Sequence, residues 1–207
     1  MDEMRGAAPV DKSVLWVNTD CVMNDLILLA ALLDGAKHGW VLKKLGGWVT
    51  GHGEMHNNLV YPAMKKFVAR GWVRRRVEAG QRGQTRAVYS LTGSGNKELF
   101  RRLNQFGEKE AASATEFRLR VGLFHVLPSE TRKRILDERG RWLAAREERF
   151  VELQQKLAAM KPGAWGPEVV DFLIVEVRAE RRWIAALAKR SNQLADAGAN
   201  PKKLGRR

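Results

Sequence analysis

The sequence contains a single cysteine and no long apolar run, and both absences limit what the chain can be. Cys21 has no second cysteine to pair with, so the composition fits the reducing cytoplasm. We expect a buried thiol at this position, with a redox sensor as the alternative. No stretch reaches the roughly 18–20 apolar residues that a membrane span needs. Residues 1–5 also lack the basic start of a signal peptide. The sequence predicts a cytoplasmic protein without membrane contact.

Patterns typical of catalytic and metal sites are also missing. No phosphate-binding glycine loop and no nucleophile–base arrangement occurs in a suitable setting, so we expect no enzyme activity. His38, His52 and His56 lack the spacing of a helical metal-binding pair, and Glu54 stands alone among them. We therefore predict neither a metal ion nor another cofactor. His38 is expected to stabilise a turn between the first two helices.

Acidic residues are scarce between Lys37 and Arg86. This window holds eleven Lys and Arg but only two acids, Glu54 and Glu78, so it carries a net charge of +9 out of the formal +14 of the chain. Lys and Arg that contact phosphates release counterions, and this supplies most non-specific affinity for DNA. The alternative is a charged face that only contacts solvent.

Residues 56–92 predict a basic helix followed by a basic ribbon. In the helix, apolar residues recur at a spacing of three and four: Leu59, Val60, Met64, Phe67 and Val68. After Gly71 the pattern changes to two short strands joined by a turn at 79–84, with these apolar positions: Trp72, Val73, Val77, Ala87, Tyr89 and Leu91. This order is that of a winged helix-turn-helix, in which the helix enters the major groove and the wing rests on the DNA backbone.

Two shorter helices are expected before the basic one. The first covers residues 22–33 and ends at Asp34-Gly35, with these residues facing inward: Leu26, Ile27, Leu29, Ala30 and Leu33. The second covers residues 36–45, and Gly46-Gly47 should close it. Pro62 is tolerated only near a helix start or at a kink, which places the start of the basic helix at Asn57 or Asn58. Either residue would cap the helix or read adenine through its amide.

Four motifs in this order resemble the PadR family of bacterial transcription regulators. They lie within residues 24–105 and read as follows: Leu28-Leu29-Ala30 before Gly35-x-x-His38-Gly39-Trp40; Val60-Tyr61-Pro62-Ala63-Met64; Arg70-Gly71-Trp72-Val73; and Arg86-x-x-Tyr89-x-Leu91-Thr92-x-x-Gly95. Trp40 stands where the family prefers Tyr, and residues 56–59 replace a usual Ser-x-Gly-Thr start. Because the second change lies where bases would be contacted, a family operator sequence does not carry over.

The charge pattern and the resemblance together give a set of expected DNA-binding residues. The resemblance implies a phosphate contact for Tyr61, for which a packing ring is the alternative, and Arg82 is expected at the wing tip between Gly80 and Gly83. The full set is Lys37, His56, Asn57, Asn58, Tyr61, Lys65, Lys66, Arg74, Arg75, Arg82 and Arg86.

The second half of the sequence predicts a helical domain. A linking helix covers residues 94–106, a domain boundary is expected at 107–113, and a short amphipathic helix ends at Pro128. Ser129 should cap a long helix that runs to about Met160, and Pro167 begins the last helix. Apolar residues recur every seven in the long helix and form a stripe in the last one, although Arg139 and Arg146 interrupt the first pattern. The expected dimerisation residues are Leu136, Leu143, Phe150, Leu157, Leu173, Val177 and Ile184.

We thus expect a mainly α protein with a small two-stranded wing. Its parts are an N-terminal arm (1–21), a winged-helix domain (22–107), a helical, antiparallel coiled-coil dimerisation domain (114–190) and a basic tail (191–207). The resemblance implies a homodimeric repressor that binds a pseudo-palindromic double-stranded DNA operator and is released by a small-molecule effector. Effector pockets of relatives form near clustered aromatic residues, for which the candidates are Trp142, Phe150 and Trp183, with Trp165 and Phe172 nearby. A plain aromatic core is the alternative.

Two other functions also fit the charge. One is a basic nucleic-acid-binding structural protein that does not read sequence, and the other is a winged helix used for protein–protein contact. A persistent preference for operator over random DNA would distinguish the repressor from both.

Overall fold

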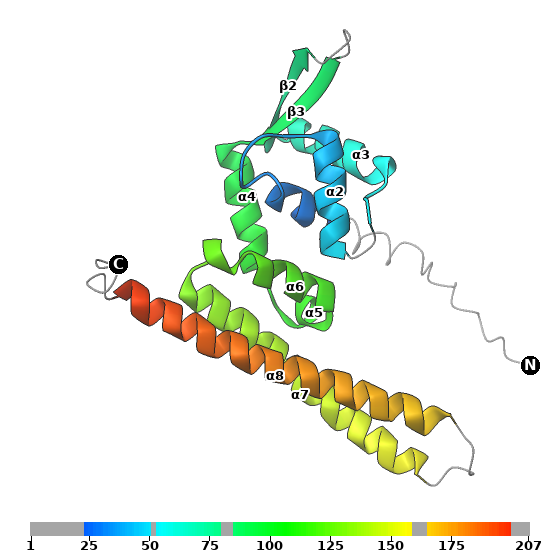
Figure 1. Cartoon of the computed structure of the whole chain (residues 1–207). Coiled ribbons are helices and arrows are strands. Elements are labelled where there is room, and N and C mark those ends of the chain that lie inside the picture. Colours follow the sequence, from blue (N-terminus) through cyan, green and yellow to red (C-terminus); the bar gives the residue numbers. More distant parts are fainter. Residues whose placement is uncertain (1–22, 51–52, 80–84, 159–164, 200–207) are drawn as a thin grey trace, which may run out of the picture. The chain divides into compact units, whose positions relative to one another are not determined.

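The computed structural model describes residues 23–50, 53–79, 85–158 and 165–199, with side chains for all of these except 48–50 and 194–199. The N-terminal arm, Cys21, His52, Arg82 with its two flanking glycines, Met160 and residues 200–207 lie outside the described part. The chain forms two compact units, which meet in the sequence between Leu103 and Asn104 (Figure 1). No described helix is long and apolar enough to cross a membrane.

The first unit begins with a helix at residues 23–30, which buries Leu26, Ile27 and Leu29 as expected. Residues 31–34 form a turn, and Gly35 follows with φ +114°. This backbone conformation is open to glycine but costly for other residues, so the chain turns here as the sequence predicted. The helix nevertheless ends three residues before Leu33, and Ala30 and Leu33 are only half-buried.

The predicted bounds of the second helix are wrong. Lys37–His38 form a short strand, β1, and helix α2 covers Gly39–Thr50. Gly46 and Gly47 therefore lie inside a helix that they were expected to close. An ideal Cβ on Gly46 would stand 2.0 Å from Sδ of Met55, and one on Gly47 would stand 1.5 Å from the carbonyl oxygen of Gly53. These glycines allow the following segment to pack directly against α2.

Helix α3, Asn57–Ala69, begins where Pro62 predicted and buries Val60, Met64 and Phe67. Two other residues of the expected apolar stripe are exposed, because Leu59 has 42% and Val68 has 37% of its surface accessible. The buried face of α3 is thus narrower than its apolar spacing indicated.

The ribbon has the expected form, with strands β2, Val73–Ala79, and β3, Thr85–Leu91. Strand β1 pairs with the free edge of β3, so the antiparallel sheet has three strands in the order β1-β3-β2. A two-residue strand is too short for a periodic pattern, and the sequence therefore did not reveal it. Helix α4, Gly93–Asn104, follows the sheet. The fold of this unit is a winged helix, as predicted (Figure 1).

The second unit is helical. It contains α5, Glu108–Ala112; α6, Ala114–Gly122; a short 3-10 helix, Phe124–Val126; α7, Ser129–Leu157; and α8, Gly166–Ala199. The stretch 107–113, expected as a boundary, contains α5, whose Ala111 is fully buried. Pro128 occupies the N-cap position of α7 without a side-chain cap, so Ser129 is the first helical residue and does not cap. Ser191, placed in a tail by the sequence, is a buried residue of α8.

Helices α7 and α8 form an antiparallel hairpin whose core uses much of the predicted dimerisation stripe. Leu136, Leu143, Val177 and Ile184 are buried within one chain, whereas Phe150, Leu157 and Leu173 are half-buried. Arg139, which interrupts the apolar pattern, is 2% exposed and donates hydrogen bonds of 2.9 and 2.8 Å to the Glu180 carboxylate. Several residues predicted to hold two chains together are therefore buried between α7 and α8 of a single chain.

Candidate nucleic-acid interface

The amino-terminal turn of α3 presents three polar side chains to solvent. His56, Asn57 and Asn58 are all exposed. The N-cap residue is His56, and its side chain forms no capping hydrogen bond. The expectation that Asn57 or Asn58 caps the helix is therefore wrong. Because capping does not occupy them, both amides can point donors and acceptors at a base edge.

Tyr61 combines exposure with packing. Its side chain is 45% exposed, while its ring edge lies so close to Gly39 that a Cβ there would be 2.9 Å from Cε1. The missing side chain of Gly39 thus makes room for the Tyr61 ring at the start of α2. The ring therefore has the packing role, and its partial exposure leaves the phosphate contact of the hydroxyl a prediction.

The structure separates Lys65 from Lys66. Lys65 is exposed, whereas Nζ of Lys66 lies 2.7 and 2.6 Å from the two carboxylate oxygens of Asp25. Consecutive helical residues point about 100° apart, which explains how neighbours on one helix meet different surroundings. The pairing with Asp25 therefore distinguishes Lys66 from Lys65 within the expected DNA-binding set.

The arginines of the ribbon lie on two different faces. Side chains alternate along a strand, and residues directly opposite each other share a face. Arg74 and Arg76 therefore share one face with Arg86, which pairs with Glu78 across the ribbon. Arg75 lies on the other face, opposite Tyr89, which also pairs with Lys37 of β1.

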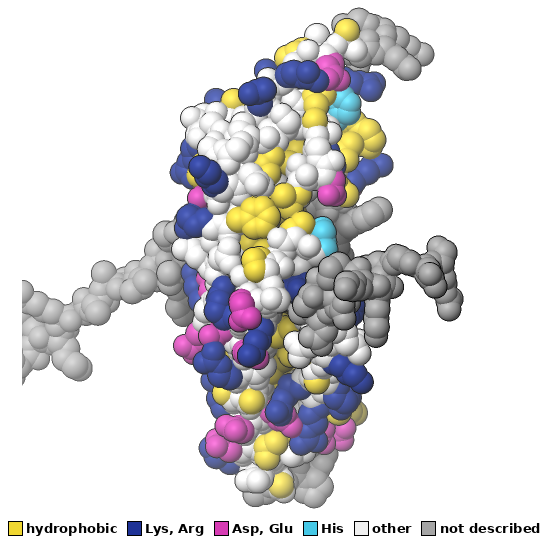
Figure 2. Space-filling view, turned by 90° about the vertical axis from the view of Figure 1, so that its left-hand side faces the viewer, with side chains coloured by type: hydrophobic (Ala, Val, Ile, Leu, Met, Phe, Trp, Pro, Cys, Tyr) yellow, Lys and Arg dark blue, Asp and Glu magenta, His cyan; other side chains and the backbone are white. Residues whose placement is uncertain are grey.

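Arg76 is exposed and belongs to the same face as Arg74 and Arg86, although it was not among the expected site residues. The two-residue alternation of β2 would have identified it. Its Nη2 lies 3.1 Å from Oε1 of Glu78, a surface pair that leaves the guanidinium accessible. Lys and Arg side chains prevail around the ribbon, whereas acids are interspersed with them over α7 and α8 (Figure 2).

Two further arginines meet at an aromatic ring between α3 and β2. The guanidinium carbons of Arg70 and Arg102 lie 4.9 and 5.1 Å from the centre of the Trp72 ring. Trp72 also packs at 5.8 Å from Phe67 of α3. Cation–π contacts of this kind contribute about 0.5–1 kcal/mol at exposed sites, so the ring helps to fix the turn where the helix meets the ribbon.

Two of the cavities in the described part of the second unit bear on the expected effector site. One of about 230 Å³ includes the expected effector residues Trp142 and Phe150 in its lining. The guanidinium of Arg146 lies over both rings, at 5.0 and 4.8 Å. Trp183 is not part of this lining and instead meets Phe117 edge-on at 5.7 Å. The expected aromatic trio is therefore not one site.

The other cavity, of about 270 Å³, lies between the α6 end and α8. It is lined by apolar side chains together with two arginines and a histidine: Val121, Gly122, Phe124, His125, Arg132, Leu187, Arg190 and Ser191. Nε of Arg132 is buried without a hydrogen-bond partner. Among the described residues, no group of three His, Cys, Asp or Glu is arranged to hold a metal ion.

The comparison with known proteins concerns the first unit. Residues 28–101 match the Transcriptional regulator PadR-like family, which confirms the resemblance seen in the four motifs. This match covers the helices before the wing, the wing and most of α4. Residues 28–101, less than half of the chain, are therefore similar to the PadR-like transcriptional regulators. No curated protein matches the chain.

Several solved structures are similar to the chain at low identity. Bacillus subtilis PadR in complex with operator DNA is 18% identical, with 82% of this chain and 97% of that chain covered and a TM-score of 0.40. The same protein in complex with p-coumaric acid is 16% identical, with 83% and 97% covered and a TM-score of 0.35. A PadR family transcription regulator from Clostridium difficile is 20% identical, with 38% and 81% covered and a TM-score of 0.32.

Proposed function

We propose that this chain is a sequence-specific, double-stranded-DNA-binding transcription regulator that acts as a homodimeric repressor. One observation carries the proposal: exposed His56, Asn57 and Asn58 begin α3, and exposed arginines of the ribbon follow within a PadR-like domain. Amides can read adenine in the major groove, and arginines can hold phosphates beside it. The two roles are thus supplied by adjacent parts of one winged helix.

The proposed DNA-binding set differs from the one expected from the sequence. Arg76 joins it, and Arg82, which lies outside the described residues, stays in it as a prediction. The set keeps His56, Asn57 and Asn58 as candidate base readers, and Lys66 leaves it because of its pairing with Asp25. The candidate phosphate contacts, drawn from exposed or half-buried residues of α3 and the sheet, are Lys37, Tyr61, Lys65, Arg74, Arg75, Arg76 and Arg86.

A second copy of the chain is proposed to bind along the outer face of α8. Many of the predicted dimerisation residues are buried between α7 and α8 of one chain. Another row of apolar residues, along α8, remains exposed. Trp165 is 82% exposed, and Val169, Phe172 and Val175 are between 57% and 60% exposed. Val169, Phe172 and Val175 recur every three residues, so they share one side of α8, and Trp165 directly precedes this helix. A contiguous exposed apolar row of this kind is typical of an interface.

Release by a small effector is proposed for the second unit. The cavity beside Arg132 and Arg190 supports it best, because an unpartnered buried Nε next to apolar walls suits an anionic molecule with an apolar body. The cavity containing Trp142 and Phe150 is the second candidate, although arginine already covers both rings.

Selection from random double-stranded DNA tests the proposed function directly. The full chain should enrich one pseudo-palindromic sequence, and its affinity for that sequence should exceed its affinity for random DNA by about 10³-fold or more at a fixed salt concentration. Equal affinity for both would favour the non-sequence-specific structural protein. No binding above that of a neutral control domain would favour a protein–protein contact module.

A further inference from the structure

Asp25 is a buried acid in an apolar helix. It is 5% exposed and is followed by Leu26, Ile27, Leu28 and Leu29, each no more than 2% exposed. A carboxylate in such a place is costly unless cations and hydrogen bonds compensate it. Compensation comes from Nζ of Lys66 at 2.6 and 2.7 Å and from Nη1 of Arg102 at 3.6 Å. The carboxylate therefore joins helix 23–30 to both α3 and α4.

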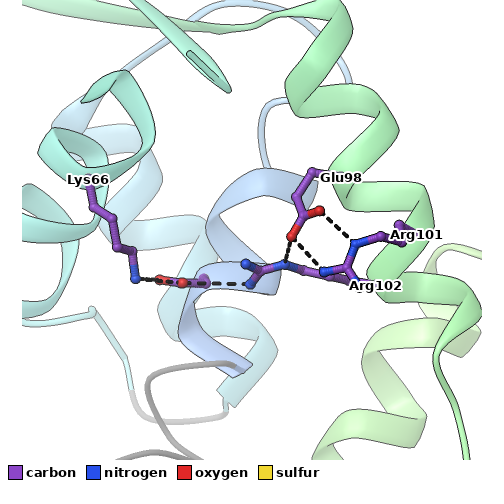
Figure 3. A network of polar contacts seen from close by, with 5 residues as sticks. Lys66, Glu98, Arg101 and Arg102 are labelled. Carbon is purple, nitrogen blue, oxygen red and sulfur yellow. Dashed lines mark hydrogen bonds and ion pairs between the residues drawn. The ribbon is translucent and has the colours of Figure 1, made fainter. Parts of the chain in front are cut away.

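The α4 side of this network is itself held in place (Figure 3). Glu98 accepts a hydrogen bond of 2.7 Å from Nε of Arg102, and Arg102 also lies over the Trp72 ring. Lys66, on the opposite side, reaches inward from α3 with its side chain 32% exposed. Helix α3 is thus held by a charged contact on a face about 100° around the helix from Lys65.

We propose that Asp25 is a positioning residue for DNA recognition, acting through Lys66. By binding the Lys66 ammonium, Asp25 sets the position of α3. The Lys66 charge is then neutralised by Asp25 and does not contact DNA phosphate. The inference rests on the proposed DNA-binding function and adds a residue of another helix to it. The neighbouring Lys65 is exposed on α3, and its ammonium group contacts DNA phosphate in this proposal.

The two adjacent lysines provide a matched test of the charge assignment. Lys65→Met should lower the slope of log affinity against log salt by about 0.9 for each phosphate that the side chain no longer neutralises. Lys66→Met should leave this slope unchanged, on random DNA as well as on the selected operator. A slope that falls equally in both variants would overturn the assignment of Lys66 to Asp25.

Asp25→Asn tests the positioning role. With α3 less firmly seated, the ratio of operator to random-DNA affinity should fall by about fivefold or more, the equivalent of one weakened base contact. Lys66→Arg, which keeps the charge, should preserve most of the ratio. An Asp25→Asn protein that is folded and retains the full ratio would overturn the positioning role.

Folding and function are separated by further measurements. Far-UV circular dichroism identifies the temperature range in which every variant is folded. If Lys66→Met alone unfolds, the double variant Asp25→Asn, Lys66→Met removes both charges of the ion pair and takes its place. Its slope should equal that of the wild type, and a lower slope would count against the proposal. If the wild type preferred no sequence, the proposed function would fail, while slopes on random DNA would still decide the role of Lys66. A wild type that bound no DNA would overturn both.

Discussion

At the scale of single residues, the proposed base readers at the start of α3 do not cap the helix. His56 occupies the N-cap position without a side-chain bond, and the exposed Asn57 and Asn58 are the first two helical residues. Substitution of either asparagine therefore removes an amide without removing a cap. This property makes the turn suitable for testing recognition by mutation.

Asn58→Ala should reduce operator affinity by about 1–3 kcal/mol if its amide pairs with a base. Affinity for random DNA should change little, so the ratio of the two falls. Gel-shift titrations at one salt concentration measure both quantities. A ratio that stays at the wild-type value would exclude Asn58 as a base-reading residue. The same titration of Asn57→Ala would then show whether Asn57 reads a base.

Glu98 illustrates how a single partly buried carboxylate can make stability depend on pH. Hydrogen bonds from Arg101 and then Arg102, partly opposed by burial, lower the pKa of Glu98 from 4.5 to about 2. A carboxyl with a lowered folded-state pKa stabilises the protein above its ordinary pKa, and this contribution disappears as the pH falls towards the folded value.

Glu98→Gln should therefore be less stable than the wild type at neutral pH, and the difference should shrink between pH 4.5 and about 2. Urea unfolding at several pH values measures the free energy of unfolding for both proteins. Glu148→Gln, a change on the surface of α7, serves as the control. A difference that is constant over this pH range would contradict the role given to the Arg101 and Arg102 contacts.

At the scale of elements, the junction between the sheet and α4 depends on one close backbone approach. An ideal Cβ on Gly95 would lie 1.9 Å from the carbonyl oxygen of Trp72. The hydroxyl of Thr92 donates to Gly71 and Trp72 carbonyls at 2.6 and 3.0 Å, and the Gly95 N–H donates to this hydroxyl at 3.0 Å. These hydrogen bonds connect the first turn of α4 with residues 71–72, which directly precede strand β2.

Two glycine-to-alanine changes should have opposite effects on stability. Gly95→Ala should cost about 1–3 kcal/mol because the backbone of Trp72 must shift to avoid the new methyl group. Gly140→Ala, in the middle of α7 with nothing within 4 Å of the added Cβ, should stabilise by about 1 kcal/mol through helix propensity. Thermal unfolding followed by circular dichroism compares them. A neutral Gly95→Ala would mean that the close approach is easily relieved.

At the scale of the whole molecule, the α7–α8 hairpin combines two apolar surfaces. One is the internal core, with Leu143 and Val177 buried, and salt bridges such as Arg178 to Glu147 at 2.6 Å accompany it. The other is the exposed row on α8 that includes Val169 and Phe172. A change in the second row should affect association without unfolding the hairpin.

Phe172→Glu should convert the proposed dimer into a monomer while the helix content stays the same. The added charge would be buried without a partner at the contact between two chains, which is unfavourable. Analytical ultracentrifugation of the full chain measures the oligomeric state. Glu176→Gln provides a control on the same helix. A Phe172→Glu protein that remained a tight dimer would direct attention to the N-terminal arm as the alternative contact.

The sequence by itself determined the order of the helices and the two-stranded ribbon in the first unit, although not strand β1. Local signals were sufficient there: Gly35 and Gly71 have positive φ, Pro62 marked the early part of α3, and strand alternation marked the ribbon. The same signals predicted the antiparallel helices of the second unit, because a periodic apolar stripe must be buried against some partner.

Only the tertiary structure decided which partner each residue meets. Lys65 and Lys66 are identical in the sequence, yet one is exposed and the other is bound to Asp25, 41 positions away. Gly46 and Gly47 resemble a helix end in the sequence, but Met55 and the loop before it pack on them in the fold. The heptad stripe likewise did not say whether its partner was α8 of the same chain or another chain. Spacing records which side of an element is apolar, whereas contacts between distant segments are fixed by how those sides fit together in space.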